Sequence, residues 1–306
     1  MKKQILAILA IMIQFNTVLA CDICGCGVGN NYVGILPEFR KHTIGLRYKT
    51  SSIYTNLGIG ATPTYMTNKE VYNTIELWGG FKLSNKWRLL ATVPYSFNHR
   101  NTSTGARSKA GIGDINGLFF YELINTRRTT NQSKLLINTL WIGTGLKLPT
   151  GQYNAVDKNT ANSNNLFQLG TGSVDISIAA MYDLRLQDAG ININGQYKIN
   201  TTNRYDYRFG NKGTISTQLY YKWRIANQFT IAPSAGLLME QSALDYDKKE
   251  AVDISKGQLT MATFGFEGNV NKIAFGINWQ TPLKQEMGLG TIQANNRGMI
   301  HLSYLF

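Results

Sequence analysis

The stretch Gly298-Met299-Ile300-His301-Leu302-Ser303-Tyr304-Leu305-Phe306 alternates between two kinds of position. Glycine, isoleucine, leucine, tyrosine and phenylalanine occupy the even positions, and the odd positions hold methionine, histidine, serine and leucine. A period of two predicts a β-strand. In a soluble protein, this strand would present an aromatic edge where a sheet frays most easily, which promotes aggregation. The stretch is therefore better explained as part of a closed sheet.

An outer-membrane β-barrel of a Gram-negative bacterium provides that closure, because its last strand pairs with its first. Tyr304 and Phe306 also resemble the C-terminal sorting signal of that protein class, in which alternating apolar residues end in an aromatic one. The resemblance implies that the barrel-assembly machinery is a partner. The alternative is an ordinary last strand of a soluble sheet.

The composition fits a membrane barrel better than a membrane helix. After residue 20, no apolar run in the 306-residue chain approaches the roughly 20 residues that a spanning helix needs. A barrel strand needs no such run, because only every second residue faces lipid. The net charge of +13 suits the anionic lipid and lipopolysaccharide of a cell envelope. Basic residues do not cluster beyond pairs such as Arg127-Arg128, so we expect no nucleic-acid partner.

Residues 1–20 have the features of a secretory signal peptide. Lys2 and Lys3 precede an apolar core at 5–13, and Val18-Leu19-Ala20 provides a small-residue cleavage site. The core is too short for a spanning helix. We therefore expect the mature protein to begin at Cys21.

All three cysteines, Cys21, Cys24 and Cys26, lie directly after this signal. Three explanations remain open. Cys21 could be lipidated, because Val-Leu-Ala-Cys resembles a lipoprotein processing box. Two of the cysteines could form a disulfide in the oxidising envelope. Alternatively, the three thiolates could bind Cu(I) or Zn(II), although a closed structural zinc site needs a fourth ligand. We expect no other cofactor.

The remaining chain divides into a Cys-rich periplasmic or plug segment, 21–41, and a barrel, 42–306. About twelve segments show strand-like alternation, and they are 42–52, 71–83, 87–98, 111–123, 135–148, 174–184, 191–200, 215–225, 229–239, 259–269, 273–280 and 298–306. Ile191, Ile193 and Tyr197 show the cleanest alternation, against asparagine, glutamine and lysine. We expect the apolar side chains to face lipid and the polar ones to face the interior.

The connections support this barrel. Short turns follow the second, sixth, eighth and tenth segments, and long polar loops follow the odd-numbered ones. The connection after the fourth, around Arg127-Arg128, is intermediate. Such alternation is typical of an all-β transmembrane barrel with antiparallel up-and-down strands, and it places both chain ends in the periplasm. The predicted loops include 101–109, 201–212, 245–256 and 287–296.

An interior filled by the polar faces would contain charged residues of both signs. They are Arg47, Glu76, Lys82, Arg88, Asp114, Glu122, Asp175, Asp183, Lys198, Lys222, Arg224 and Glu267. The simpler interpretation is that these charges pair and fill a narrow barrel, because an unpaired buried charge is expensive. The functional interpretation is a polar path for a small solute.

The sequence offers little support for an enzyme. It has no nucleophile-elbow, zinc-protease or phosphate-loop motif. His42 and His301 could be neighbours across the closure of the barrel, and a His301–Ser303 dyad is conceivable. We therefore expect no catalytic residues.

Three short motifs, taken in order, resemble a known family. They are Gly111-Ile112-Gly113-Asp114, Gly145-Leu146-Lys147-Leu148-Pro149-Thr150-Gly151 and Gly170-Thr171-Gly172-Ser173-Val174-Asp175, with Val93-Pro94-Tyr95 upstream. Together they resemble the outer-membrane barrels of meta-pathway phenol-degradation type, a family of transporters. The resemblance implies passage of small, often hydrophobic or aromatic, molecules and supplies no catalytic residue. The Cys-rich start is not part of that pattern.

The sequence thus supports three functional hypotheses. The first is a passive channel for small solutes. The second is a non-transporting envelope barrel that anchors a metal- or redox-linked partner through its Cys-rich segment. The third is an outer-membrane enzyme.

Overall fold

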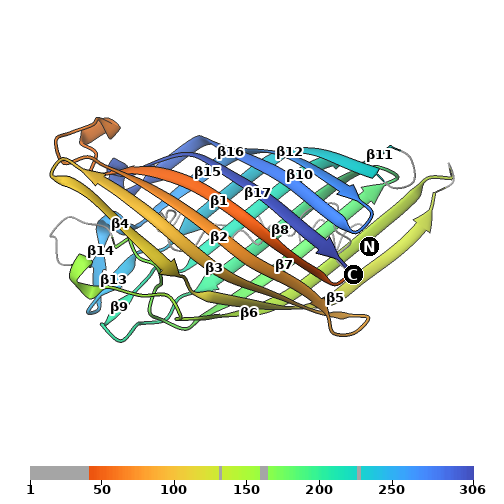
Figure 1. Cartoon of the computed structure of the whole chain (residues 1–306), viewed down its shortest axis with the longest axis horizontal. Helices are drawn as coiled ribbons and strands as arrows, with labels where there is room; N and C mark the ends of the chain where they lie inside the picture. The colour runs from red at the N-terminus through yellow and green to blue at the C-terminus, as the bar shows by residue number, and fades with distance from the viewer. Residues whose placement is uncertain (1–40, 131–132, 159–164, 226–228) are drawn as a thin grey trace, which may run out of the picture.

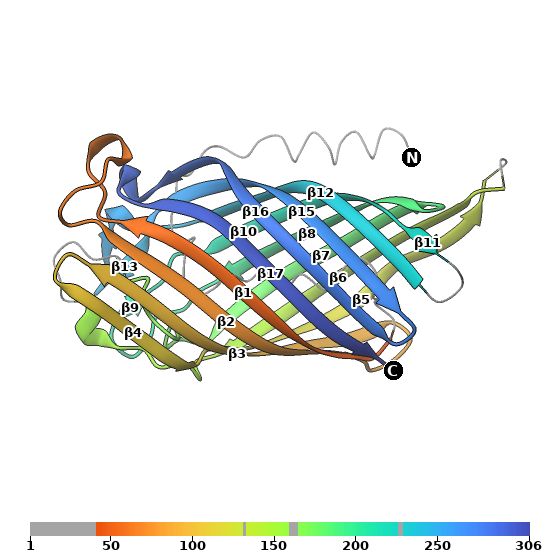
Figure 2. The same ribbon diagram turned by 45° about the horizontal axis from the view of Figure 1, so that its top comes forward.

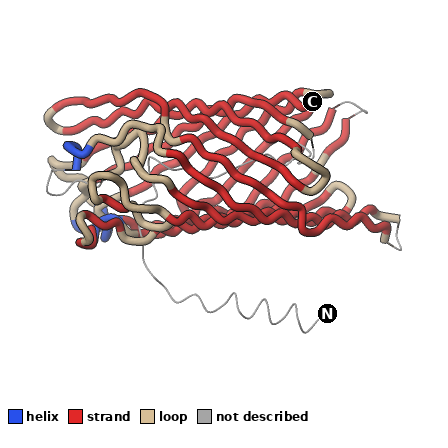
Figure 3. Tube along the Cα trace, turned by 90° about the horizontal axis from the view of Figure 1, so that it is seen from below, coloured by secondary structure: helices blue, strands red, loops and turns tan. Residues whose placement is uncertain are grey.

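A computed structural model of the chain describes residues 41–130, 133–158, 165–225 and 229–306. The predicted signal peptide, the segment 21–40 and its three cysteines lie outside these described residues. The described chain forms a closed barrel of twelve antiparallel strands (Figures 1 and 3), which confirms the predicted fold. Its strands are β1 (Thr43–Thr55), β2 (Asn68–Lys82), β3 (Trp87–Thr102), β5 (Ile115–Thr129), β6 (Leu135–Leu148), β7 (Asp175–Leu186), β8 (Ala189–Ile199), β10 (Lys212–Tyr221), β12 (Phe229–Ser242), β15 (Gly257–Val270), β16 (Ile273–Met287) and β17 (Gln293–Leu305).

Neighbours in the barrel wall are neighbours in the sequence, and the first strand closes the ring with the last (Figure 2). The closing register pairs Thr43 of β1 with Leu305 of β17 and Arg47 with His301. His42 and Phe306 exchange two backbone hydrogen bonds beyond the ends of these strands, at 3.1 and 3.0 Å. Among the described residues, no helix is both long enough and apolar enough to cross a membrane.

Alternation along the strands separates an apolar outer face from the interior. On β17, Leu302 is 57% exposed whereas Ser303 is 2% exposed, and on β8 Tyr197 is 49% exposed. Exposed aliphatic and aromatic side chains recur in this way all around the wall. A surface this apolar is what lipid covers. The predicted outward orientation of the apolar faces is confirmed.

The two rims of the barrel differ in their connections. The rim that carries Lys41 and Phe306, named the terminal rim, has short turns such as 83–86, 187–188 and 271–272. The opposite rim, named the long-loop rim, carries the longer connections, including 56–67 and the β6–β7 loop. The predicted alternation of short and long connections is therefore present.

Several local predictions are wrong. The expected loop 101–109 is largely a hairpin, in which β3 continues to Thr102 and pairs with β4 (Gly105–Ile112). The predicted strand 111–123 is interrupted at Gly113 and Asp114, between β4 and β5. Arg127 and Arg128 lie within β5 rather than in a turn. The first and third of these errors share a cause, because hairpin extensions beyond a membrane need no apolar face and carry no period-two signal.

Other predicted loops contain short elements. The expected loops 201–212 and 245–256 contribute a small three-stranded sheet of β9 (Tyr207–Arg208), β13 (Asp245–Asp247) and β14 (Glu250–Val252). The 3-10 helices η1 (Ile59–Ala61), η2 (Ala155–Lys158), η3 (Asp253–Ser255) and η4 (Gly288–Gly290) lie in the long loops. Strand β11 (Trp223–Ile225) continues the line of β10 and pairs with β12. The expected loop 287–296 ends early, because β17 begins at Gln293.

Candidate functional site: the barrel interior

The interior is less polar than predicted, because one side of it is apolar. Six buried residues of β2, β3, β5, β6 and β7 form a cluster toward the terminal rim, named the rim cluster: Trp78, Leu90, Leu118, Phe120, Trp141 and Ala179. The alternation in the sequence did not reveal that these residues face inward, because runs such as Leu118-Phe119-Phe120 are apolar on both faces of the strand. The interior of a water-filled barrel is polar, so this cluster is a distinguishing feature of the site.

Large side chains of the interior lie flat against the barrel wall rather than across its axis. The Phe120 ring covers Gly143 so closely that a Cβ atom there would lie 2.7 Å from it. Leu118 covers Gly145 in the same way. These glycines therefore give the two large side chains space on the wall.

A second apolar cluster lies toward the long-loop rim and is named the loop cluster. Leu166 and Phe167 of the β6–β7 loop belong to this cluster together with buried residues of β1, β2, β12, β15, β16 and β17 and of the connection before β17: Ile53, Tyr72, Leu238, Leu259, Met261, Met287, Ile292 and Ala294. Arg100 lies 4.4 Å from the centre of the Phe167 ring, and Lys109 donates a 2.6 Å hydrogen bond to the Phe167 carbonyl. Leu166 and Phe167 of the loop thus lie inside the barrel and narrow it at this end.

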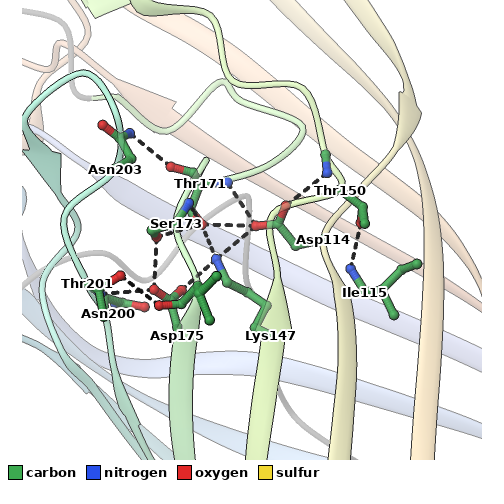
Figure 4. Close-up of polar contacts among 12 residues, drawn as sticks. Asp114, Ile115, Lys147, Thr150, Thr171, Ser173, Asp175, Asn200, Thr201 and Asn203 are labelled. Carbon is green, nitrogen blue, oxygen red and sulfur yellow. Dashed lines mark hydrogen bonds and ion pairs between the residues drawn. The ribbon is translucent and has the colours of Figure 1, made fainter.

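A buried ion pair fixes this loop to the wall (Figure 4). Lys147 of β6 lies between two carboxylates, with Nζ 2.8 Å from Asp114 Oδ2 and 2.5 Å from Asp175 Oδ2. Its side chain is 8% exposed, and those of Asp114 and Asp175 are 4% and 0% exposed. Lys147 also hydrogen-bonds to Thr171. We call this group, with its backbone donors, the loop joint.

The loop backbone completes the joint by donating to the same carboxylates. Gly151 N and Thr171 N donate to Asp114 at 3.0 and 2.9 Å, and Thr201 N donates to Asp175 at 3.0 Å. The chains approach so closely that a Cβ on Gly170 would collide with Asp114 Oδ1. The three sequence motifs therefore meet at one point. Their glycines and charged residues serve this contact.

A polar band separates the two apolar clusters. Arg47 of β1 pairs with Glu76 of β2 at 3.1 Å, and Lys49 pairs with the other oxygen of Glu76 at 2.8 Å. Next to them, Thr74 and Ser96 share a 3.1 Å hydrogen bond between their hydroxyl groups. Lys49, Thr74 and Ser96 are half-buried and face inward. We call these five residues the polar band.

The other predicted interior residues occupy varied positions. Glu267 and Arg88 are buried, each 1% exposed, and Glu122 is also buried. Asp183 accepts a 2.8 Å hydrogen bond from Tyr220, and Lys198 and Lys222 are half-buried. Lys82 and Arg224, in contrast, lie exposed at the terminal rim, where Arg224 pairs with Asp188 at 2.9 Å. Their strands extend past the interior, which alternation alone does not reveal.

Sequence reasoning missed several buried charges near the long-loop rim. Glu240 pairs with Arg297 at 3.0 Å, and Glu70 pairs with Arg100 at 2.9 Å. Lys147 was also missed, although it lies within one of the quoted motifs. These residues lie where the predicted strands were too short or their alternation was unclear. For Glu70 and Arg100, which face each other on the neighbouring strands β2 and β3, opposite charges at matching heights would have been the available signal.

Outside the membrane-spanning strands, the loops form an aromatic cluster of Tyr153, Tyr207 and Phe209. Asn165 donates a 2.8 Å hydrogen bond to the Tyr153 hydroxyl. Burial raises the pKa of the Tyr153 phenol, and hydrogen bonds with Asn165 and Asn203 partly oppose that shift. Tyr207 hydrogen-bonds to buried Asp245, which also accepts from Gly210 N at 2.7 Å. The long loops are thus packed structures with their own core.

The histidines do not form either of the arrangements that the sequence allowed. His42 stacks on Phe306, with ring centres 5.5 Å apart, whereas His301 faces Arg47 across the closing pair. These two histidines are therefore not neighbours. Ser303 Oγ is buried and makes no hydrogen bond within the described part of the chain, so it is not bonded to His301. Among the described residues, no three histidine, cysteine or acidic side chains are grouped so that they could hold a metal ion.

Comparison with known proteins identifies solved structures with a similar fold. The chain is similar to an outer membrane channel from Pseudomonas putida F1, with 16% identity over 87% of this chain and 96% of that one and a TM-score of 0.56. Weaker likeness extends to the NanC porin (11% identity, 85% and 98% coverage, TM-score 0.41) and to the CymD monoaromatic hydrocarbon channel (8%, 95% and 95%, 0.39). No known sequence family and no curated protein matches the chain. The similarity to the first of these structures supports the fold, a closed antiparallel β-barrel.

Proposed function

We propose that this chain is a passive outer-membrane channel for small solutes that have an apolar or aromatic part. The observation that carries the proposal is the rim cluster, which places Trp78, Phe120 and Trp141 on the inner wall. These side chains pack together at 4%, 1% and 6% exposure, so a solute with an aromatic ring would reach them as they move apart. They would then give it a favourable surface, which the polar interior of a water-filled porin lacks.

The order of surfaces along the interior supports a path. A solute that enters from the long-loop rim would pass the loop cluster, then the polar band, then the rim cluster. In the band, Arg47 and Lys49 share the single carboxylate of Glu76, so the band adds hydrogen-bonding groups and one net positive charge. A solute with an apolar body and a few polar groups would find apolar side chains in the two clusters and hydrogen-bonding groups in the polar band. None of these three surfaces would bind it strongly.

Matched solutes test this proposal. Proteoliposomes with the purified mature chain would be assayed for uptake of phenyl β-glucoside and methyl β-glucoside, which share a sugar and differ in the aromatic ring. We expect ion conductance in planar bilayers and preferential uptake of the phenyl compound. The double substitution Trp78→Ala and Trp141→Ala should abolish the preference. Alanine at the lipid-facing Trp223 and Trp279, which are 51% and 48% exposed, is the matched control.

A non-transporting barrel is the second candidate, and the density of the interior favours it. Arg88, Phe120 and Glu70 are all less than 2% exposed inside the wall. In that case neither conductance nor glucoside uptake would occur, and the barrel would anchor a partner through Cys21, Cys24 and Cys26. Intact-mass analysis of the mature N-terminus, with and without copper or zinc, would distinguish an acyl chain, a disulfide and a bound metal.

The location of the barrel in the cell and its orientation in the membrane form part of the same proposal. We place the barrel in the outer membrane of a Gram-negative bacterium, surrounded by lipid and lipopolysaccharide, with both chain ends in the periplasm. Delivery would depend on the barrel-assembly machinery, which would read Tyr304 and Phe306. Both side chains face outward, at 46% and 54% exposure, so they are accessible to such a partner.

A further inference from the structure

The β5–β6 hairpin projects beyond the terminal rim (Figures 1 and 2). Strand β3 begins at Trp87, which pairs with Tyr121 of β5. The last backbone hydrogen bond described on the β3 side of β5 is the 2.8 Å bond from Glu122 N to the Lys86 carbonyl. From residue 123 to Thr129, β5 pairs within the described chain only with β6. At about 3.3 Å per residue, this leaves about 23 Å of open strand edge.

The other side of the hairpin is held in place. Strand β6 continues to pair with β7 as far as Leu136 and Leu186. Gln187 N donates a 2.8 Å bond to the Leu135 carbonyl, and the Gln187 side chain accepts one from Leu135 N at 3.3 Å. A register shift between Glu122 and Ile124 marks the point where β5 leaves the barrel wall. The open edge therefore belongs to a sheet that is fixed to the barrel.

This edge is strongly basic. Arg127, Arg128 and Lys134 are exposed, and residues 123–136 contain no aspartate or glutamate. An open strand edge offers unpaired N–H and C=O groups that can pair with another chain, and natural proteins usually cover or blunt such edges. Here the edge combines unpaired backbone groups with positive charge.

We propose that the open edge of β5 docks an extended, acidic polypeptide segment as an additional strand at the terminal rim. Backbone hydrogen bonds along residues 123–129 would supply affinity. Arg127, Arg128 and Lys134 would select carboxylates on the partner and exclude basic segments. The proposal does not depend on transport, because the edge lies outside the interior.

The competing explanation is that the arginines only protect the edge from pairing, since charge on an edge strand discourages association. The two explanations predict opposite results with an acidic strand. Protection predicts that no extended peptide binds, whereas docking predicts binding that needs both backbone groups and charge.

The test uses the purified full mature chain in detergent and a fluorescent peptide that alternates glutamate with valine. Anisotropy should report binding that weakens at least about tenfold when alternate peptide nitrogens are methylated or when lysine replaces glutamate. Arg127→Glu with Arg128→Glu should cause a similar loss. Lys248→Glu with Lys249→Glu at the opposite rim is the matched control and should leave binding unchanged. Hydrogen exchange should show new protection in residues 123–129.

Three outcomes would overturn the proposal. Equal binding of the methylated peptide would show that backbone pairing is not involved. Absence of new protection at the β5 amides would show that the peptide binds elsewhere. Binding to phosphatidylglycerol vesicles that depends on the two arginines, without any peptide binding, would assign the basic edge to lipid headgroups.

Discussion

Two buried groups of polar residues, at opposite ends of the barrel interior, differ in how their polar atoms are bonded. At the loop joint, Asp114 receives two backbone N–H groups and the Lys147 ammonium, and all the groups involved are buried. Near the terminal rim, Trp78 Nε1 and Ser303 Oγ are buried on either side of Gly45 and make no hydrogen bond within the described chain. The joint is built to hold a loop in place. The pair beside Gly45 instead has buried polar atoms without a protein partner in the described chain.

Lys147→Met should cause the largest loss of stability. It leaves Asp114 and Asp175 buried without their shared cation, and removing one partner of such a group costs roughly 3–5 kcal/mol. Urea unfolding in detergent, followed by tryptophan fluorescence, measures the loss. The triple variant Lys147→Met, Asp114→Asn, Asp175→Asn should recover much of it, because no uncompensated charge remains. Unchanged stability of Lys147→Met would show that the joint does not hold the loop.

The sequence predicted the wall well and the interior only in part. Alternation such as that of Ile300, Leu302 and Tyr304 has a direct cause, because lipid demands an apolar residue at every second position. Positions that face the interior have no such uniform requirement for one kind of side chain. Trp78 and Phe120 face inward although they are apolar, and Lys147 pairs with partners 33 residues before and 28 after it in the sequence. Contacts between distant segments leave no periodic trace.

Phe167→Ala should have an intermediate effect on stability. Its effect on transport separates the role of the loop cluster from that of the rim cluster. Removing the ring from the loop cluster should cost about 3 kcal/mol and leave a gap on the axis side of the narrowed end. We expect larger single-channel conductance and faster uptake of both glucosides, with little change in their ratio, because the rim cluster is intact. Phe264→Ala, on the lipid face at 54% exposure, is the control. Unchanged conductance would place the narrowest point elsewhere.

The smallest expected effect on stability is the difference between alanine substitutions at two buried serines. Ser173 Oγ donates a 2.9 Å bond to Asp175 and lies 3.1 Å from Thr171 Oγ1, whereas Ser303 Oγ makes no hydrogen bond within the described chain. Ser173→Ala removes one of two hydrogen bonds to the buried Asp175 Oδ1 and leaves only that from Thr201 N, so it should cost about 1–3 kcal/mol of unfolding free energy. Ser303→Ala removes a buried polar atom that has no protein partner, so it should be neutral or slightly stabilising. The pair is well matched, because both serines are buried and both substitutions remove one oxygen. Equal losses in urea unfolding would mean that Ser303 is bonded through an ordered water, and the contrast between the two ends would then disappear.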